Sequence, residues 1–245
     1  GEAVRLFFRH GMGHARNLRQ LWQILQVKDA VGQLDLPERD ELLVLCGRIE
    51  DLPNWADLVR ETVSDPSGDL HQAVAVADHL GIDLTGELLA AVRADPVKHA
   101  GHIPRLFRDP GAARELTALY EKALPLAEMA SGMGDQLFSP TYGRESNCLD
   151  WLFEGLREHP LLGHKLVAAG LMSPVVRNRD LACSVLEAWR ERLGQPVAVF
   201  SPSLSETLRR IAAAEVDEEI RGKMANLLGG DGADNPARGQ EQDGH

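Results

Sequence analysis

Apolar side chains recur along the chain at the spacing i, i+3, i+4, i+7, which lines one face of an α-helix. The clearest stripes are Leu18, Leu21, Trp22 and Leu25; Leu42, Leu45, Cys46 and Ile49; Trp55, Leu58, Val59 and Thr62; Leu116, Leu119, Tyr120 and Ala123; Leu149, Leu152, Phe153 and Leu156; and Ala182, Val185, Leu186, Trp189 and Leu193. The pattern predicts an all-α protein with about ten to twelve helices of ordinary length. Each helix has one apolar face, so neighbouring helices must cover one another.

Residues that start and stop helices separate these stripes. Asp35 before Pro37 is typical of a helix start, because Pro fits the first turn. Asn147, with Asp150 three residues later, predicts an N-terminal cap by a variant of the capping box. A glycine at the end of a stripe favours a left-handed C-terminal cap. The glycines in such positions are Gly81, Gly170, Gly194 and Gly229.

Strand patterns are nearly absent. The best candidate is the run Val197 to Phe200, which lies between Pro196 and Pro202. One run cannot form a sheet. We therefore expect an extended connection between two helices at this point.

Helix breaks recur at regular intervals. An acidic residue or Ser precedes Pro at residues 65–66, 109–110 and 173–174, and Asp217 breaks the last helix pair without a Pro. The steps between these breaks are 44, 64 and 44 residues. Two steps match the period of ~40–47 residues that repeats of paired helices show, and the longer step leaves room for an insertion. The sequence thus predicts stacked antiparallel helix pairs.

Two runs in the last part of the chain share one pattern. Asp217 to Arg221 is followed by Met224 and Leu228, and Ser173 to Arg177 is followed by Ala182 and Leu186. These runs resemble the second helix of the HEAT-repeat family, an armadillo-type α-solenoid. The resemblance covers residues 160–228 and implies a short solenoid whose extended surface binds other proteins. An Asp–Pro break at residues 95–96 gives a competing frame, so an irregular helical bundle is the alternative fold.

Two segments differ in composition from the helical body. Residues 131–147 (SGMGDQLFSPTYGRESN) are rich in Gly and Ser, which predicts a loop inserted into a single helical domain over residues 1–228. Residues 229–245 contain no large apolar side chain. Such a segment buries too little surface to offset the entropy of ordering, so we expect a disordered tail.

Charge and cysteine content narrow the function classes. The 245 residues include 26 Lys plus Arg and 37 Asp plus Glu, a net charge of −11. This balance disfavours nucleic-acid binding and adsorption to anionic membranes, which both need a basic surface. No apolar run reaches the ~18–20 residues of a membrane span. Cys46, Cys148 and Cys183 lie among apolar residues, as free thiols in a reducing compartment do, and we expect a cytoplasmic protein.

Candidate metal and cofactor motifs are weak. His10 and His14 have the spacing of helical metal ligands, but glycines adjoin them and a third ligand is missing. Asp95, His99 and His102 would share one helix face, yet Pro and Gly bracket them. We interpret both sets as surface residues and expect no bound metal and no cofactor.

The inserted loop and the start of the next helix carry residue types that are enriched at protein contacts. The candidate interaction surface comprises Phe138, Tyr142, Arg144, Glu145 and Trp151. Trp151 lies beside the apolar stripe of its helix. Burial that widens the stripe is the favoured interpretation, and exposure as an anchor beside the loop is the alternative.

The sequence therefore predicts a non-catalytic protein-interaction module or scaffold, whose partner it does not identify. The first alternative is an enzyme with a hidden acid–base or metal site, because the many carboxylates could pair in three dimensions. The second alternative is an enzyme that acts on nucleic acid, which the HEAT resemblance allows and the net charge opposes.

Overall fold

The computed structural model describes residues 55–65 and 69–229, with a few isolated positions between residues 22 and 44. These residues form α-helices, a short 3₁₀ turn and one isolated β-bridge, and no strand occurs among them. The all-α prediction is confirmed. The helices are α4 (Trp55–Ser64), α5 (Leu70–Leu80), α6 (Thr85–Ala94), η2 (Ala100–His102), α7 (Ile103–Leu106), α8 (Pro110–Ala123), α9 (Leu126–Met129), α10 (Gly143–Leu156), α11 (His164–Leu171), α12 (Val176–Leu193), α13 (Val197–Phe200), α14 (Pro202–Ala212) and α15 (Glu218–Gly229).

The chain divides into two compact units, Gly1–Ala90 and Ala91–His245. In the first unit α4 packs against α5, and Trp55 and Val59 bury the apolar face of α4. The sequence expectation of a single helical domain over residues 1–228, with an inserted loop and a tail, stays a prediction.

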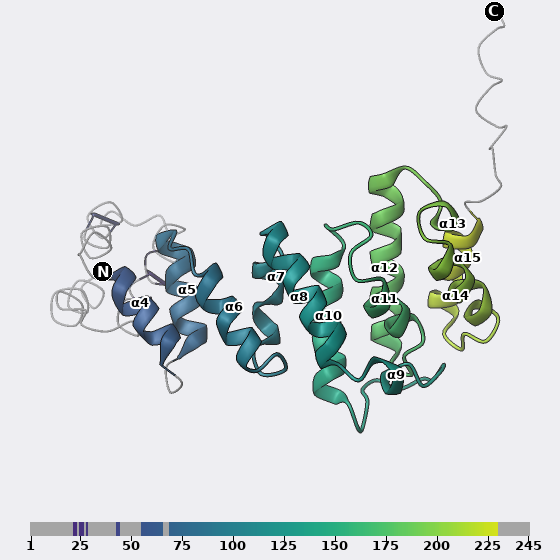
Figure 1. The fold of residues 1–245 in the computed structure, drawn as a ribbon, viewed down its shortest axis with the longest axis horizontal. Coiled ribbons are helices and arrows are strands. Elements are labelled where there is room, and N and C mark those ends of the chain that lie inside the picture. Colours follow the sequence, from purple (N-terminus) through teal and green to yellow (C-terminus); the bar gives the residue numbers. More distant parts are fainter. Residues whose placement is uncertain are drawn as a thin grey trace, which may run out of the picture. The chain divides into compact units, whose positions relative to one another are not determined.

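Six helices of the second unit pack in two rows. α10, α12 and α15 are neighbours in one row, and α9, α11 and α14 are neighbours in the other. The pairs α11–α12 and α14–α15 connect the rows, and α12 lies between α10 and α15 (Figure 1). The prediction of packed helix pairs is confirmed, and the arrangement is compatible with a helical solenoid.

The apolar stripe of α12 lies at the centre of this unit. Four of its five predicted members, Ala182, Val185, Leu186 and Trp189, are fully buried, and Leu193 at the end of the helix is half-buried. The Trp189 indole N–H also donates a 2.7 Å hydrogen bond to the carbonyl of Leu156 at the end of α10. The stripe therefore packs as predicted, and one hydrogen bond fixes the orientation of its largest side chain.

Several helix ends also agree with the sequence. Asp109 caps α8 and Asp217 caps α15, because each carboxylate accepts hydrogen bonds from backbone N–H groups of the first turn. Gly81 and Gly194 adopt the left-handed conformation at the ends of α5 and α12. At these four positions Asp or Gly marks the helix end, because a cap acts within one turn of the backbone.

The cap predictions for Gly170 and Gly229 are wrong, since neither glycine is left-handed. Gly170 lies inside α11, where an added Cβ would come within 2.4 Å of the Phe153 ring. The absence of a side chain at Gly170 therefore serves close packing between helices and not helix termination.

The predicted loop 131–147 ends five residues earlier than expected. Helix α10 begins at Gly143, because the Tyr142 carbonyl already accepts a 2.8 Å hydrogen bond from the Ser146 N–H. Asn147 consequently lies within α10, and the prediction that it caps the helix is wrong. Residues 131–142 remain as the connection between α9 and α10.

The run Val197 to Phe200 is not extended and forms the helical turn α13. The Phe200 N–H donates to the Pro196 carbonyl at 3.3 Å, and the Ser201 N–H donates to the Val197 carbonyl at 2.8 Å. A strand needs a partner for its backbone groups. Because none lies beside this run, the turn satisfies those groups locally.

None of the helices in the described ranges is long and apolar enough to cross a membrane. The expectations about Asp35, His10, His14, Cys46 and the tail after Gly229 concern residues outside these ranges.

Candidate functional site

The connection between α9 and α10, residues 131–142, is fastened to the helical body through Gly132 and Gln136. We call it the anchored loop. Three backbone hydrogen bonds join it to residues 172–176, which are the connection between α11 and α12 and the first residue of α12. The bonds run from Gly132 N to Met172 O (3.0 Å), from Gln136 N to Pro174 O (3.2 Å) and from Val176 N to Gln136 O (3.0 Å). A segment that looks flexible in the sequence is therefore tied to the helical body.

Gly134 allows this close approach. A Cβ at this position would lie 3.1 Å from the Pro174 carbonyl oxygen and 3.2 Å from the Pro174 Cβ. Both distances are shorter than ordinary van der Waals contacts, so any larger residue would push the anchored loop away from its partner segment.

The tip of the anchored loop carries two adjacent exposed apolar side chains. Leu137 is 85% exposed and Phe138 is 70% exposed. Sequence reasoning selected Phe138 and missed Leu137. The signal was present, because Leu137 and Phe138 form the only pair of adjacent large apolar residues in the polar run 131–142.

The other predicted surface residues lie on α10 or at its start. Tyr142 is half-buried, and its N–H donates a 2.9 Å hydrogen bond to Ser139 Oγ, while Arg144 is exposed and Glu145 is half-buried in the first turn. Trp151 lies about two turns further along the helix and is 44% exposed. The favoured interpretation of Trp151 as buried is wrong, because its side chain leaves the face that packs against the other helices. Whether these five residues form an interaction surface stays a prediction.

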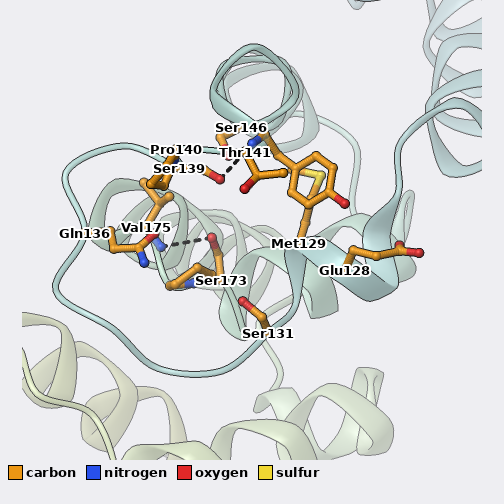
Figure 2. Close-up of a pocket in the computed structure, with 12 residues that line it drawn as sticks. Glu128, Met129, Ser131, Gln136, Ser139, Pro140, Thr141, Ser146, Ser173 and Val175 are labelled. Carbon is orange, nitrogen blue, oxygen red and sulfur yellow. Dashed lines mark hydrogen bonds between the residues drawn. The ribbon is translucent and has the colours of Figure 1, made fainter.

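A cavity of about 320 Å³ lies between the anchored loop, α9, the start of α10 and residues 173–175 (Figure 2). Six of its lining residues carry hydroxyl groups: Ser131, Ser139, Thr141, Tyr142, Ser146 and Ser173. Gln136 adds an amide, and Glu128 is the charged residue in the lining. Figure 2 shows the Glu128 side chain extending away from the other labelled residues. The cavity is therefore polar and nearly uncharged inside.

Some of the cavity's hydroxyl groups already have protein partners. Ser173 Oγ donates to Asn178 Oδ1 at 3.2 Å and accepts from the Val175 N–H at 3.1 Å. Ser146 is 5% exposed, its backbone carbonyl accepts from Asn178, and its hydroxyl forms no hydrogen bond with the described part of the protein. The Ser146 hydroxyl is not fully buried, since the fully buried hydroxyl groups without a partner among the described residues are those of Ser201 and Ser205, and part of it therefore stays accessible in the cavity wall.

A polar network joins α10 to α12 beneath this cavity. The Asn178 amide donates to the Ser146 carbonyl at 3.0 Å and to Asp150 Oδ1 at 2.7 Å. Arg177 forms an ion pair with Asp150 at 2.8 Å. Burial raises the pKa of the Asp150 carboxyl above its ordinary value, although Arg177 and Asn178 act in the opposite direction.

A fully buried ion pair lies on the other side of the α11–α12 connection. The Arg179 guanidinium donates two 2.7 Å hydrogen bonds to the Glu215 carboxylate, and a third, 2.8 Å bond to the Ser173 carbonyl. Glu215 also accepts from the Asp217 N–H, and its own carbonyl accepts from Arg221. The bidentate geometry and the additional bonds satisfy both charges within the protein.

Sequence reasoning missed this pair and assigned the HEAT-like arginine to Arg177. Arg177 is largely exposed, whereas Arg179 is fully buried. A signal existed, since Arg179 precedes Ala182, Cys183 and Leu186 at the spacing of the buried stripe. A charge in an apolar stripe needs a buried partner, but the sequence alone cannot identify Glu215, 36 residues later.

The two described cysteines have unreactive thiol groups. Cys148 and Cys183 are free and buried, and burial is the main cause that raises the pKa of each thiol to about 12. The Cys148 thiol also donates to the Arg144 carbonyl at 3.2 Å. Because the thiolate is the nucleophilic form, neither residue is an activated nucleophile near neutral pH.

The predicted set Asp95, His99 and His102 does not converge on one point. Asp95 Oδ1 accepts from the Lys98 N–H at 2.9 Å, and the imidazole rings of His99 and His102 stack with centroids 6.3 Å apart. Burial lowers the pKa of His99. Within the described ranges, no group of three or more His, Cys, Asp or Glu side chains is placed to hold a metal ion.

Comparison of the chain with protein-family models, with curated proteins and with solved structures finds no match. The candidate site therefore has to be interpreted from its own geometry.

Proposed function

We propose that this chain is a non-catalytic module that binds another protein, built as a short HEAT-like stack of helix pairs. The observation that carries the proposal is the tip of the anchored loop, where Leu137 and Phe138 are exposed side by side. Aromatic and large apolar side chains dominate the centres of protein–protein contacts.

The fastening of the anchored loop supports this proposal. A flexible loop loses conformational entropy when it binds, and this loss weakens binding. The three backbone hydrogen bonds to residues 172–176 restrict the loop before a partner arrives. The backbone that carries Leu137 and Phe138 is thus pre-organised, and the loop loses less conformational entropy when it binds a partner.

The surroundings of the loop fit the same function. Tyr142, Arg144 and Glu145 follow the loop at the start of α10, and Trp151 is exposed further along that helix. Stacked helix pairs also form extended surfaces that commonly bind other chains. The fold adds to the proposal only by analogy. The free thiols fit a reducing compartment, and we propose the cytoplasm.

Site-specific photo-crosslinking tests the proposal. A photoreactive phenylalanine at position 138 is compared with the same group at Val216, which is 57% exposed in the α14–α15 connection. Both variants are produced in the native source, and crosslinked proteins are identified by mass spectrometry. We expect a protein that is captured at position 138 and not at position 216.

The captured partner is then purified and its affinity is measured. Phe138→Ser should weaken binding at least tenfold, as expected for a central contact residue, and Val216→Ser should leave it unchanged. Equal capture at both positions, or an affinity of Phe138→Ser within twofold of the wild type, would contradict the proposal.

A further inference from the structure

We propose that the cavity behind the anchored loop binds a neutral, polyhydroxylated ring of about monosaccharide size. The first argument is its lining, in which six residues carry hydroxyl groups and Gln136 carries an amide. Ser139 and Ser173 already bond within the protein, so Ser131, Thr141, Tyr142 and Ser146 supply the remaining hydroxyl groups. Each hydroxyl group both donates and accepts hydrogen bonds. A wall of this kind matches a ligand that also alternates donors and acceptors, which is the chemistry of a polyol or a sugar.

The charges of the cavity exclude other ligand classes. Glu128 is the single charged residue of the lining, and its carboxylate is exposed at the edge. A phosphate or carboxylate ligand would enter without a cation to replace its hydration, and it would be repelled by Glu128.

An apolar ligand is disfavoured by the hydroxyl groups themselves. The Ser146 hydroxyl stays partly accessible in the cavity wall, because the fully buried hydroxyl groups without a partner among the described residues are those of Ser201 and Ser205. An apolar ligand would bury this group without a partner, which costs more than a hydrogen bond returns. Water or a ligand hydroxyl group satisfies it.

The volume sets the size of the ligand. About 320 Å³ lies at the lower end of the range for small-molecule pockets, which is ~300–1,000 Å³. It holds a single ring rather than a chain of rings. The apolar atoms of Met129, Pro140 and Val175 in the lining provide contact for the carbon face of such a ring.

The cavity is separate from the proposed protein contact. Leu137 and Phe138 do not line it, although they belong to the same loop. Phe138→Ser should therefore retain sugar binding, so the two proposals can fail independently.

Saturation-transfer difference NMR on the full chain tests the inference. The probes are D-glucose, D-galactose, D-mannose, N-acetyl-D-glucosamine and myo-inositol, with glucose 6-phosphate and cyclohexanol as the charged and the apolar comparison. We expect at least one neutral ring to show transfer, and both comparison compounds to bind more weakly than that ring. Loss of one hydrogen bond in Ser146→Ala should weaken its binding about fivefold.

Two further variants make the result decisive. Thr141→Val removes an exposed hydroxyl group of the same wall and should also weaken binding, whereas Ser203→Ala removes an exposed hydroxyl group on α14 and should not. Circular dichroism checks the fold of each variant, and Thr141→Val decides if Ser146→Ala does not fold. The inference is overturned by any of three results. No neutral ring shows transfer, or glucose 6-phosphate or cyclohexanol binds as tightly as the best neutral ring, or Ser146→Ala and Thr141→Val bind that ring with wild-type affinity.

Discussion

The anchored loop and the α14–α15 connection attach to the same part of the protein by different means. The loop is joined to residues 172–176 by backbone hydrogen bonds, and its apolar side chains Leu137 and Phe138 are exposed. The α14–α15 connection, residues 213–217, instead places Glu215 in a fully buried ion pair with Arg179. The α14–α15 connection buries a charge, whereas the anchored loop exposes two adjacent large apolar side chains.

This difference separates the two roles of connecting segments. Two charges taken out of water must remain paired, so Arg179 and Glu215 constrain the way α12, α14 and α15 meet. Leu137 and Phe138 contribute little to the core because they remain in water. Substitutions at Leu137 and Phe138 can therefore alter binding without altering the fold, whereas a substitution at Glu215 alters the fold itself.

The largest expected effect is at the ion pair. Glu215→Ala leaves the Arg179 guanidinium buried without its partner, and we expect the free energy of unfolding to fall by ~3–5 kcal/mol. Urea unfolding measures this. Glu206→Ala, which removes an exposed partner of Arg209, is the matched control and should change it by less than ~1 kcal/mol.

A double variant sharpens the same comparison. Replacing both partners, as Arg179→Met with Glu215→Leu, removes the uncompensated charge, and its unfolding free energy should lie closer to the wild type than that of Glu215→Ala. A Glu215→Ala variant that is as stable as Glu206→Ala would show that the pair does not hold the connection in place.

A smaller effect is expected at the base of the anchored loop. Gly134→Ala brings a Cβ to about 3.1 Å from the Pro174 carbonyl, and we expect a loss of ~1 kcal/mol or somewhat more. Hydrogen exchange should accelerate at the amides of Gln136 and Val176, which form two of the anchoring bonds. Gly143→Ala, where an added Cβ meets nothing within 4 Å, is the control. Unchanged exchange in Gly134→Ala would mean that these bonds do not restrict the loop.

The half-buried network at α10 should respond to pH. The pKa of Asp150 is raised above 3.8 in the folded protein, so its ionised form lowers stability at neutral pH and protonation relieves this cost. Asp150→Asn keeps an acceptor for Asn178 and should be more stable than the wild type at pH 7. The advantage should shrink as the pH falls through the raised pKa towards 3.8. Urea unfolding at several pH values measures it, and an advantage that is independent of pH, or absent at pH 7, contradicts the prediction.

The smallest effect on stability is expected at the tip of the loop. Leu137→Ser combined with Phe138→Ser exposes no new core surface and should change the free energy of unfolding by less than ~0.5 kcal/mol. Thermal and urea unfolding check this. A loss comparable with that of Gly134→Ala would indicate that these side chains stabilise the fold and would remove the contrast between the two connections.

Much of the fold was predictable because it depends on local signals. Asp109 and Asp217 cap helices, and Gly194 ends α12, because a short carboxylate or a missing side chain acts within one turn of the backbone. Phe138 was identified as a surface candidate from its polar neighbours. Trp151 was predicted to be buried and is exposed. A position beside an apolar stripe is buried only if a neighbouring helix covers it.

By itself, the sequence determined that the chain is helical, which faces of α10 and α12 are apolar, and that a polar, Gly-rich segment interrupts the helices. Periodicity and caps act over a few residues, so they can be interpreted without the fold. The tertiary structure alone decided that Arg179 meets Glu215, that Gly134 brings residues 131–142 against residues 172–176, and that six hydroxyl groups surround one cavity. The first two contacts join residues 36 and 40 positions apart, and only the packing of helices brings such residues together.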